Sequence, residues 1–165
     1  MGTENKHIML MLDHPLPISK LRGVPPAVRL KLKGRRITTC AQLLLAAAKA
    51  EQRAILAAAT GIDAATLLGL VRRADMARIK GIGTVFGLML EELGVVDIER
   101  LARQQPDTLH DTLRRYNLRE RLARRSPTPE EVASWIADAR RLPVLVTYAP
   151  EEQPRMPNAL RVSAP

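Results

Sequence analysis

An internal repeat constrains this chain more than any other feature of its sequence. A shift of 58 residues places residues 21–25 (Leu-Arg-Gly-Val-Pro) on residues 79–83 (Ile-Lys-Gly-Ile-Gly). The same shift superposes four further apolar pairs: Val28 with Phe86, Leu30 with Leu88, Leu32 with Leu90, and Ile37 with Val95. A capping residue and a leucine-containing segment of helical pattern follow each match. Two supersecondary units of about 60 residues that share one hydrophobic core explain this spacing.

A helical pattern extends over almost all of the chain between Pro15 and Leu142. Alanine, leucine and arginine dominate there and β-branched residues are sparse. Residues that can cap or open helices stand at Thr38-Thr39, Asp63, Asp97, Pro106 and residues 126–131. The first of these predicts a helix from residue 40 that continues to residue 59 and stops at Thr60-Gly61. Residues 28–33 alternate as a strand would, but the repeat alignment favours a helix there too.

The sequence therefore predicts an all-α fold in four parts. Residues 1–14 form a flexible lead-in, residues 15–75 a first helical repeat, and residues 76–143 a second repeat that shares its core. Residues 144–165 form an extended, proline-rich C-terminal tail. Within this tail, residues 144–148 are a short β-prone run, and residues 149–165 are expected to be unstructured. Cys40 and Trp135 lie at helical spacing among apolar residues, so both are expected in the core.

The positive charge is concentrated in one segment. The chain has 26 lysine and arginine residues against 17 acids, a net charge of +9. Between His14 and Ala50 there is no acid, and there are eight bases. These bases are Lys20, Arg22, Arg29, Lys31, Lys33, Arg35, Arg36 and Lys49. Such an asymmetry predicts a polyanionic partner.

Residues 81–83 (Gly-Ile-Gly) are predicted to form a tight turn between two short amphipathic helices. Glycine on both sides of an apolar residue permits backbone angles that are closed to residues with Cβ. Consecutive N–H groups then point outward at the start of the second helix, where they suit a phosphate oxygen. The predicted phosphate site consists of Lys80, Gly81, Ile82, Gly83 and Thr84. A turn used only for packing is the competing interpretation, and Glu91 and Glu92 nearby favour it slightly.

This pattern resembles the helix-hairpin-helix motif of DNA-binding proteins, such as family X polymerases and Holliday-junction-binding proteins. The arrangement over residues 15–143 is similar to an uncharacterised bacterial family of tandem helix-hairpin-helix repeats. The matching positions are Ile79, Gly81, Ile82, Gly83, Leu90, Gly94 and Val95, with Thr38-Thr39 and Leu43-Leu44 after the first hairpin. The resemblance implies contact with the DNA backbone through hairpin amides, without sequence specificity. It implies no catalytic residues.

The first hairpin departs from this motif. Pro25 stands at the position of Gly83, which removes one amide donor and excludes positive φ, and Pro26 removes a second donor. Arg29 and Arg36 replace two glycines of the second copy. The first hairpin therefore has the cations and the second has the donors. A phosphate site would need both on one surface.

Composition argues against several other classes of protein. Four aromatic residues are too few for a base-stacking platform. A single cysteine forms neither an internal disulfide nor a thiolate metal site, and the three histidines are scattered, so no metal or cofactor is expected. No nucleophile or carboxylate pair has a recognisable catalytic neighbourhood, so we do not expect an enzyme. With no apolar run long enough for a membrane span and no convincing signal peptide, we expect a cytoplasmic protein.

Residues 114–125 hold a second group of arginines, here interspersed with acids, which favours a salt-bridged surface.

The function predicted from these features is binding to nucleic acid, with duplex DNA as the expected partner. The phosphate backbone would contact the turn at residues 80–84 and the basic segment. The basic residues assigned to this contact are Arg22, Arg29, Lys31, Lys33, Arg35 and Arg36. The alternative is a helical scaffold or adaptor that docks on an acidic protein partner through its basic segment or its C-terminal tail. Binding to anionic lipid headgroups is a weaker third possibility.

Overall fold

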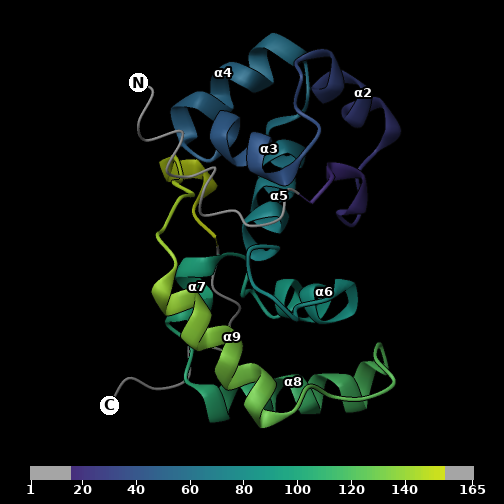
Figure 1. The fold of residues 1–165 in the computed structure, drawn as a ribbon, viewed down its shortest axis with the longest axis vertical. Coiled ribbons are helices and arrows are strands. Elements are labelled where there is room, and N and C mark those ends of the chain that lie inside the picture. The colour runs from purple at the N-terminus through teal and green to yellow at the C-terminus, as the bar shows by residue number, and fades with distance from the viewer. Residues whose placement is uncertain (1–15, 155–165) are drawn as a thin grey trace.

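The computed structural model describes residues 16–154, and this part of the chain is all-helical (Figure 1). The elements are η1 (Ile18–Lys20), α2 (Pro26–Gly34), α3 (Cys40–Ala47), α4 (Ala50–Thr60), α5 (Ala64–Met76), α6 (Thr84–Glu92), α7 (Ile98–Ala102), α8 (Pro106–Glu120), α9 (Pro129–Arg141) and η2 (Pro150–Glu152). The expected all-α class is confirmed. The predicted lead-in, residues 1–14, lies outside the described residues. No described helix is long and apolar enough to cross a membrane.

Most helix ends lie where the sequence predicts them. Thr39 accepts from the amide of Gln42 in a capping box, and Asp63 caps α5 in the same manner without the reciprocal bond. Thr128 and Glu131 form a second capping box at the start of α9. Gly61 ends α4 at a φ of 68°, in the left-handed region that glycine tolerates best.

The predicted continuous helix over residues 40–59 is wrong, because the chain breaks between α3 and α4. Lys49 has an extended backbone conformation, with φ −81° and ψ 138°. The buried guanidinium of Arg53 donates to the carbonyls of Ala47 and Ala48 at 3.0 and 2.9 Å. A continuous helix would use those two oxygens for its own backbone amides, so the buried arginine replaces two helical hydrogen bonds.

Segments that are 58 residues apart share backbone features. Helices α2 and α6 have the same length and are offset by this spacing, and α3 and α7 begin at the same offset. Gly23 and Gly81 both have positive φ, at 69° and 90°. The amide of Ile37 donates to Leu32 at 2.9 Å, and that of Val95 donates to Leu90 at 2.9 Å. We refer to residues 21–25 as the first turn and to residues 79–83 as the second turn.

The described residues bury their apolar side chains in two clusters, not in the single shared core that the sequence suggested. The first cluster contains residues of η1 and of α2 to α5, and α5 contributes to it as far as Ala74. The second begins at Met76 and contains residues of α6 to α9. The second half has a core of its own because α9 covers it with Val132, Trp135 and Ile136, all at most 2% exposed.

The segment after α9 returns to the first half of the molecule. Figure 1 shows it running from α9 back to η2 beside α4. Val146 is buried in the first cluster, and the amide of Thr147 donates to the carbonyl of Ala48 at 3.0 Å. Glu152 pairs with the buried Arg53 at 2.8 Å. The β-prone run at residues 144–148 is therefore not a strand, and residues 149–152 are ordered by contacts that the sequence did not reveal. Residues 155–165 lie outside the described part of the chain.

Candidate functional site

The second turn places a glycine where the backbone needs one. Gly81 has a φ of 90°, and a Cβ added there would lie 3.3 Å from the indole nitrogen of Trp135. Gly83 differs, because its φ is −78° and no atom lies within 4 Å of an added Cβ. Pro25, at the equivalent position, has a φ of −62°. Pro25 has a negative φ as expected, but Gly83 has one too, so the substitution changes no backbone region and removes only one N–H donor.

The start of α6 presents unsatisfied backbone donors. The first hydrogen bond of this helix runs from the amide of Gly87 to the carbonyl of Gly83 at 2.8 Å. The preceding amides, from Thr84 to Phe86, donate to no acceptor among the described residues. Gly83 and Thr84 are exposed, so these groups lie at the surface. A helix N-terminus in this state attracts anions through its amides and its dipole.

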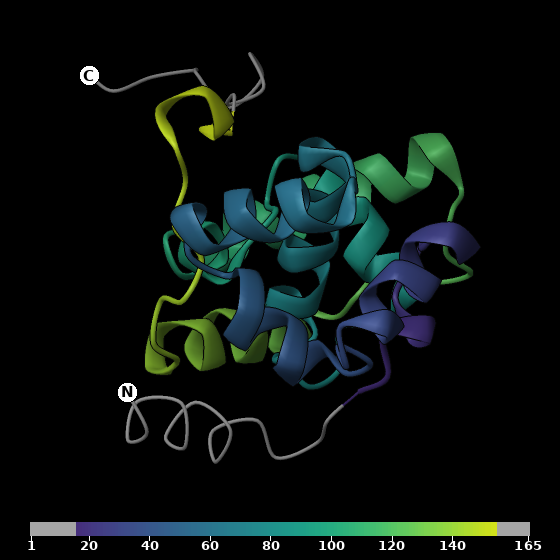
Figure 2. The same ribbon diagram turned by 90° about the horizontal axis from the view of Figure 1, so that it is seen from above.

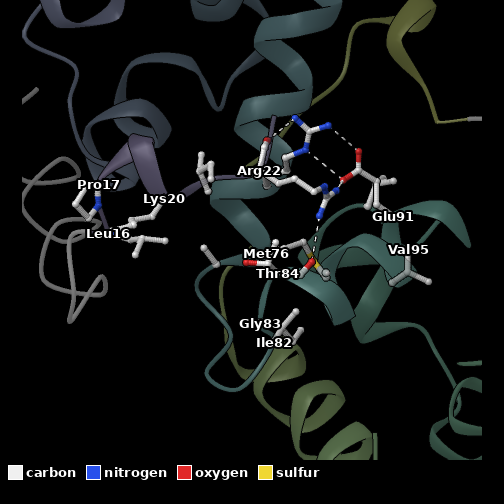
Figure 3. A pocket seen from close by; sticks show the side chains of 15 residues that line it. Leu16, Pro17, Lys20, Arg22, Met76, Ile82, Gly83, Thr84, Glu91 and Val95 are labelled. Carbon is white, nitrogen blue, oxygen red and sulfur yellow. Dashed lines mark hydrogen bonds and ion pairs between the residues drawn. The ribbon is translucent and has the colours of Figure 1, made fainter. Parts of the chain in front are cut away.

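A cavity of about 450 Å³ lies between the two turns (Figure 3). Its lining includes Lys20 and Arg22 from the first half and Ile82, Gly83 and Thr84 from the second. Arg22 also reaches across to donate to the carbonyl of Thr84 at 3.4 Å. The fold thus brings the predicted Arg22 and the predicted second turn onto one surface.

An acid neutralises part of this surface. The carboxylate of Glu91 pairs with Arg22 and, at 3.0 Å, with Arg73. Arg73 also donates to the backbone carbonyl of Arg22 at 3.0 Å, which fixes the first turn against α5. Arg22 therefore has partners within the chain and is a less available cation than the sequence predicted. Arg73 was not among the predicted site residues. The repeat alignment places Glu91 at the position of Lys33, so the opposite charges of the two halves at this position can be read from the sequence.

The five bases on or just after α2 are all exposed, and none forms an ion pair with a described residue. Two of them nevertheless have neighbours at the C-terminal end of α4. Arg35 donates to the carbonyl of Ala59 at 3.3 Å, and the ammonium of Lys31 lies 3.8 Å from the point that a Cβ on Gly61 would occupy. Cations at this end of a helix interact with its carbonyls and dipole. The side chains of the other three bases form no hydrogen bond or ion pair with a described residue, and we call them the free α2 bases: Arg29, Lys33 and Arg36.

Lys80 in the second turn is exposed and has no ion pair within the part of the chain that the structure describes. The second group of arginines is mostly salt-bridged, as predicted. Arg114 and Arg115 pair with Asp111 at 3.2 and 2.9 Å. Arg119 and Arg125 pair with Glu120 and Glu131, each at 2.8 Å. Arg121 and Arg124 form no ion pair with a described residue, an exception that the composition of the stretch concealed.

The surroundings of Cys40 and Glu131 shift the pKa values of these two side chains. Burial raises the pKa of the Cys40 thiol to about 11, so it stays protonated at neutral pH. The hydrogen bonds from Arg125 and from the backbone of Thr128 lower the pKa of Glu131 to about 2. Neither group lies at the surface between the turns. Within residues 16–154, no three side chains of histidine, cysteine, aspartate or glutamate are grouped to hold a metal ion.

Comparison with known proteins gave one family. The family described as "Domain of unknown function (DUF4332)" matches residues 22–142, well over half of the chain. The matched region begins at Arg22 in the first turn and ends just after α9, so it contains helices α2 to α9 and all of the second turn. No curated protein and no solved structure gave a match. The chain belongs to the DUF4332 family, a family defined by a domain of unknown function.

Proposed function

We propose that this chain binds the phosphate backbone of duplex nucleic acid without reading its sequence. The free α2 bases and Lys80 supply the cations, and the amides at the start of α6 supply hydrogen bonds to a phosphate oxygen. The single observation that supports this best is the state of the free α2 bases: three exposed cations close together, with no acid paired to any of them among the described residues. Solubility alone does not require such a concentration of one sign.

The proposal includes the interpretation of the two halves as tandem helix-hairpin-helix units. The equal offset of α2 and α6, the paired glycines with positive φ and the paired Ile37 and Val95 hydrogen bonds support it. The halves would then contribute unequally. Pro25 and Pro26 remove two donors from the first half, where the amides of Ala27 and Val28 are the ones left without an acceptor among the described residues. The first half therefore supplies mainly charge, and the second supplies more amides.

A titration of a labelled random duplex, followed by fluorescence anisotropy, tests this function. If about five phosphates are neutralised, raising the salt from about 50 to about 200 mM should weaken binding roughly 10²- to 10³-fold. A flat response to salt, or no binding at low salt, would contradict the proposal.

The alternative function is an adaptor that docks on an acidic protein, but docking through the C-terminal tail is now less well supported. Residues 146–152 pack against α3 and α4, and Glu152 is engaged with Arg53, so this part of the tail is not free to extend along a partner. An acidic protein could still bind the free α2 bases. Recovery of one acidic protein in fixed ratio, unaffected by nuclease treatment and combined with a flat duplex titration, would favour the adaptor.

A further inference from the structure

The turn between α8 and α9 has a fixed shape. Arg121 ends α8 in the left-handed region, with a φ of 51°, and its amide donates to Asn117 at 2.8 Å. The buried side chain of Asn117 accepts from the amide of Ala123 at 2.9 Å and donates to its carbonyl at 3.1 Å. Arg125 forms two 2.8 Å hydrogen bonds with Glu131 and lies over the ring of Phe86. The side chains of Asn117 and Arg125 are therefore held by partners within the chain.

Other side chains of this turn are exposed and have no partner among the described residues. The side chains of Arg121 and Arg124 are exposed and form no ion pair or hydrogen bond with a described residue. Two leucines beside them are also exposed: Leu118 at 65% and Leu122 at 41%. Exposed leucines are common on protein surfaces, and Leu30 and Ile55 are as exposed as Leu118. What distinguishes Leu118 and Leu122 is that they stand next to arginines that have no ion pair among the described residues.

The turn lies on the same side of the molecule as the basic helix. In Figure 1, α2, α6 and the far end of α8 follow one another down one side of the molecule. Seen from above in Figure 2, the end of α8 and the turn after it again lie on the side of α2. One extended ligand can therefore contact the free α2 bases, the start of α6 and this turn.

We infer that residues 118–124 form a second contact for nucleic acid, an inference that rests on the proposed function. Arg121 and Arg124 bind phosphates on either side of a groove, and Leu118 and Leu122 pack against the sugars and base edges within it. Positive charge around a small apolar surface matches a groove, where phosphates flank less polar sugar and base edges.

The test uses the full chain and a random DNA duplex, titrated at several salt concentrations. Changing Arg121→Gln together with Arg124→Gln should lower the slope of log affinity against log salt by about 2, because each lost phosphate contact removes about 0.9. The matched control is Arg114→Gln with Arg115→Gln. It removes the same charge from α8, shortly before this turn, but from arginines that pair with Asp111, and its slope should stay close to that of the wild type.

The leucines are tested separately. Leu118→Ser with Leu122→Ser should weaken duplex binding about 10-fold at every salt concentration and leave the slope unchanged, because buried apolar area carries no counterions. Circular dichroism should show an intact fold, since both side chains are exposed. If the serine variant instead converts a dimer to a monomer in sedimentation and leaves duplex binding unchanged, the leucines form a contact between copies and the inference is wrong.

The two proposals fail in different ways. If the Arg121 and Arg124 variant keeps the wild-type slope while the wild type binds with strong salt dependence, the second contact is overturned and the proposed function stands. If the wild type itself shows no salt-dependent binding, the proposed function fails and this inference fails with it.

Discussion

The first turn with α2 and the second turn with α6 have similar backbones and opposite surfaces. Both turns have a glycine with positive φ. The residues just after helices α2 and α6, Arg36 and Gly94, are also in the left-handed region, with φ values of 60° and 83°. On the surface, α2 has Lys33 where α6 has Glu91. The two halves thus have similar backbones although their charges at equivalent surface positions differ. The first half presents the exposed cations, and the second presents more amides without an acceptor among the described residues.

The two halves also give equivalent backbone amides, those of Cys40 and Ile98, different hydrogen-bond acceptors. In the first, the amide of Cys40 donates to the backbone carbonyl of Leu16 at 2.8 Å. In the second, the equivalent amide of Ile98 donates to the carboxylate of Asp75 at 3.1 Å. Asp75 is also paired with Arg78 at 2.8 Å, and both side chains are at most 3% exposed. A buried ion pair in the second half therefore replaces a backbone contact in the first.

The largest expected effect comes from breaking this difference with Asp75→Ala. The change leaves a buried guanidinium without its partner and the Ile98 amide without an acceptor, so it should lower the free energy of unfolding by about 4 kcal/mol. Urea denaturation followed by circular dichroism measures this. Arg103→Ala, at an exposed pair with Glu99, is the control and should cost less than about 1 kcal/mol. Equal costs for the two variants would contradict the role given to Asp75.

A second comparison separates the two glycines of the second turn. Gly81→Ala forces a Cβ into a left-handed conformation and towards Trp135, and should cost about 2 kcal/mol. Gly83→Ala places a Cβ in open space at an ordinary φ, and should cost less than about 1 kcal/mol. Thermal unfolding of both variants checks the order. If Gly83→Ala were the more damaging change, the geometry described for this turn would be wrong.

Glu91→Gln makes the second half more like the first. It releases Arg22 and Arg73 from their shared carboxylate, so affinity for a duplex should rise about 5-fold near physiological salt, as for one additional phosphate contact. The control is Glu92→Gln, which changes the same charge at an exposed neighbour that has no ion pair among the described residues. An equal gain in both variants would indicate a general effect of charge and would remove the specific role of Glu91.

The smallest effect is a dependence of stability on pH in the second half. Because folding lowers the pKa of Glu131 from 4.5 to about 2, the ionised carboxylate stabilises the native state above pH 4.5. This contribution should be lost as the pH falls from 4.5 towards 2. The melting temperature of the wild type should therefore approach that of Glu131→Gln over this range. A constant difference between the two curves would contradict the assignment.

Local features were predictable from the sequence, and long-range ones were not. Caps such as Thr39, Asp63 and Thr128 depend on side chains within three residues, so their residue types reveal them. The break before α4 depends on Arg53, whose partner Glu152 lies 99 residues away. No pattern around residue 48 indicates that contact. The ordered segment after α9 was missed for the same reason.

The candidate site shows the same division. The acid-free segment identified the bases of α2, but only the position of the end of α4 separates Lys31 and Arg35 from the free α2 bases. Likewise, the acids interspersed with the second group of arginines predicted a salt-bridged surface but did not show which arginines are paired. Which arginines they reach depends on the turn that Asn117 holds, and Arg121 and Arg124 lie beyond that reach.

The most direct test of the central claim compares two sets of α2 variants in the duplex titration. Removing the free α2 bases with Arg29→Gln, Lys33→Gln and Arg36→Asn should weaken binding about 10²-fold near 150 mM salt and lower the salt slope by about 3. Asparagine is chosen at position 36 because it tolerates the left-handed conformation found there. Lys31→Gln with Arg35→Gln should weaken binding much less. Unchanged binding in the first variant, or a greater loss in the second, would contradict the claim that the free α2 bases hold a nucleic-acid backbone.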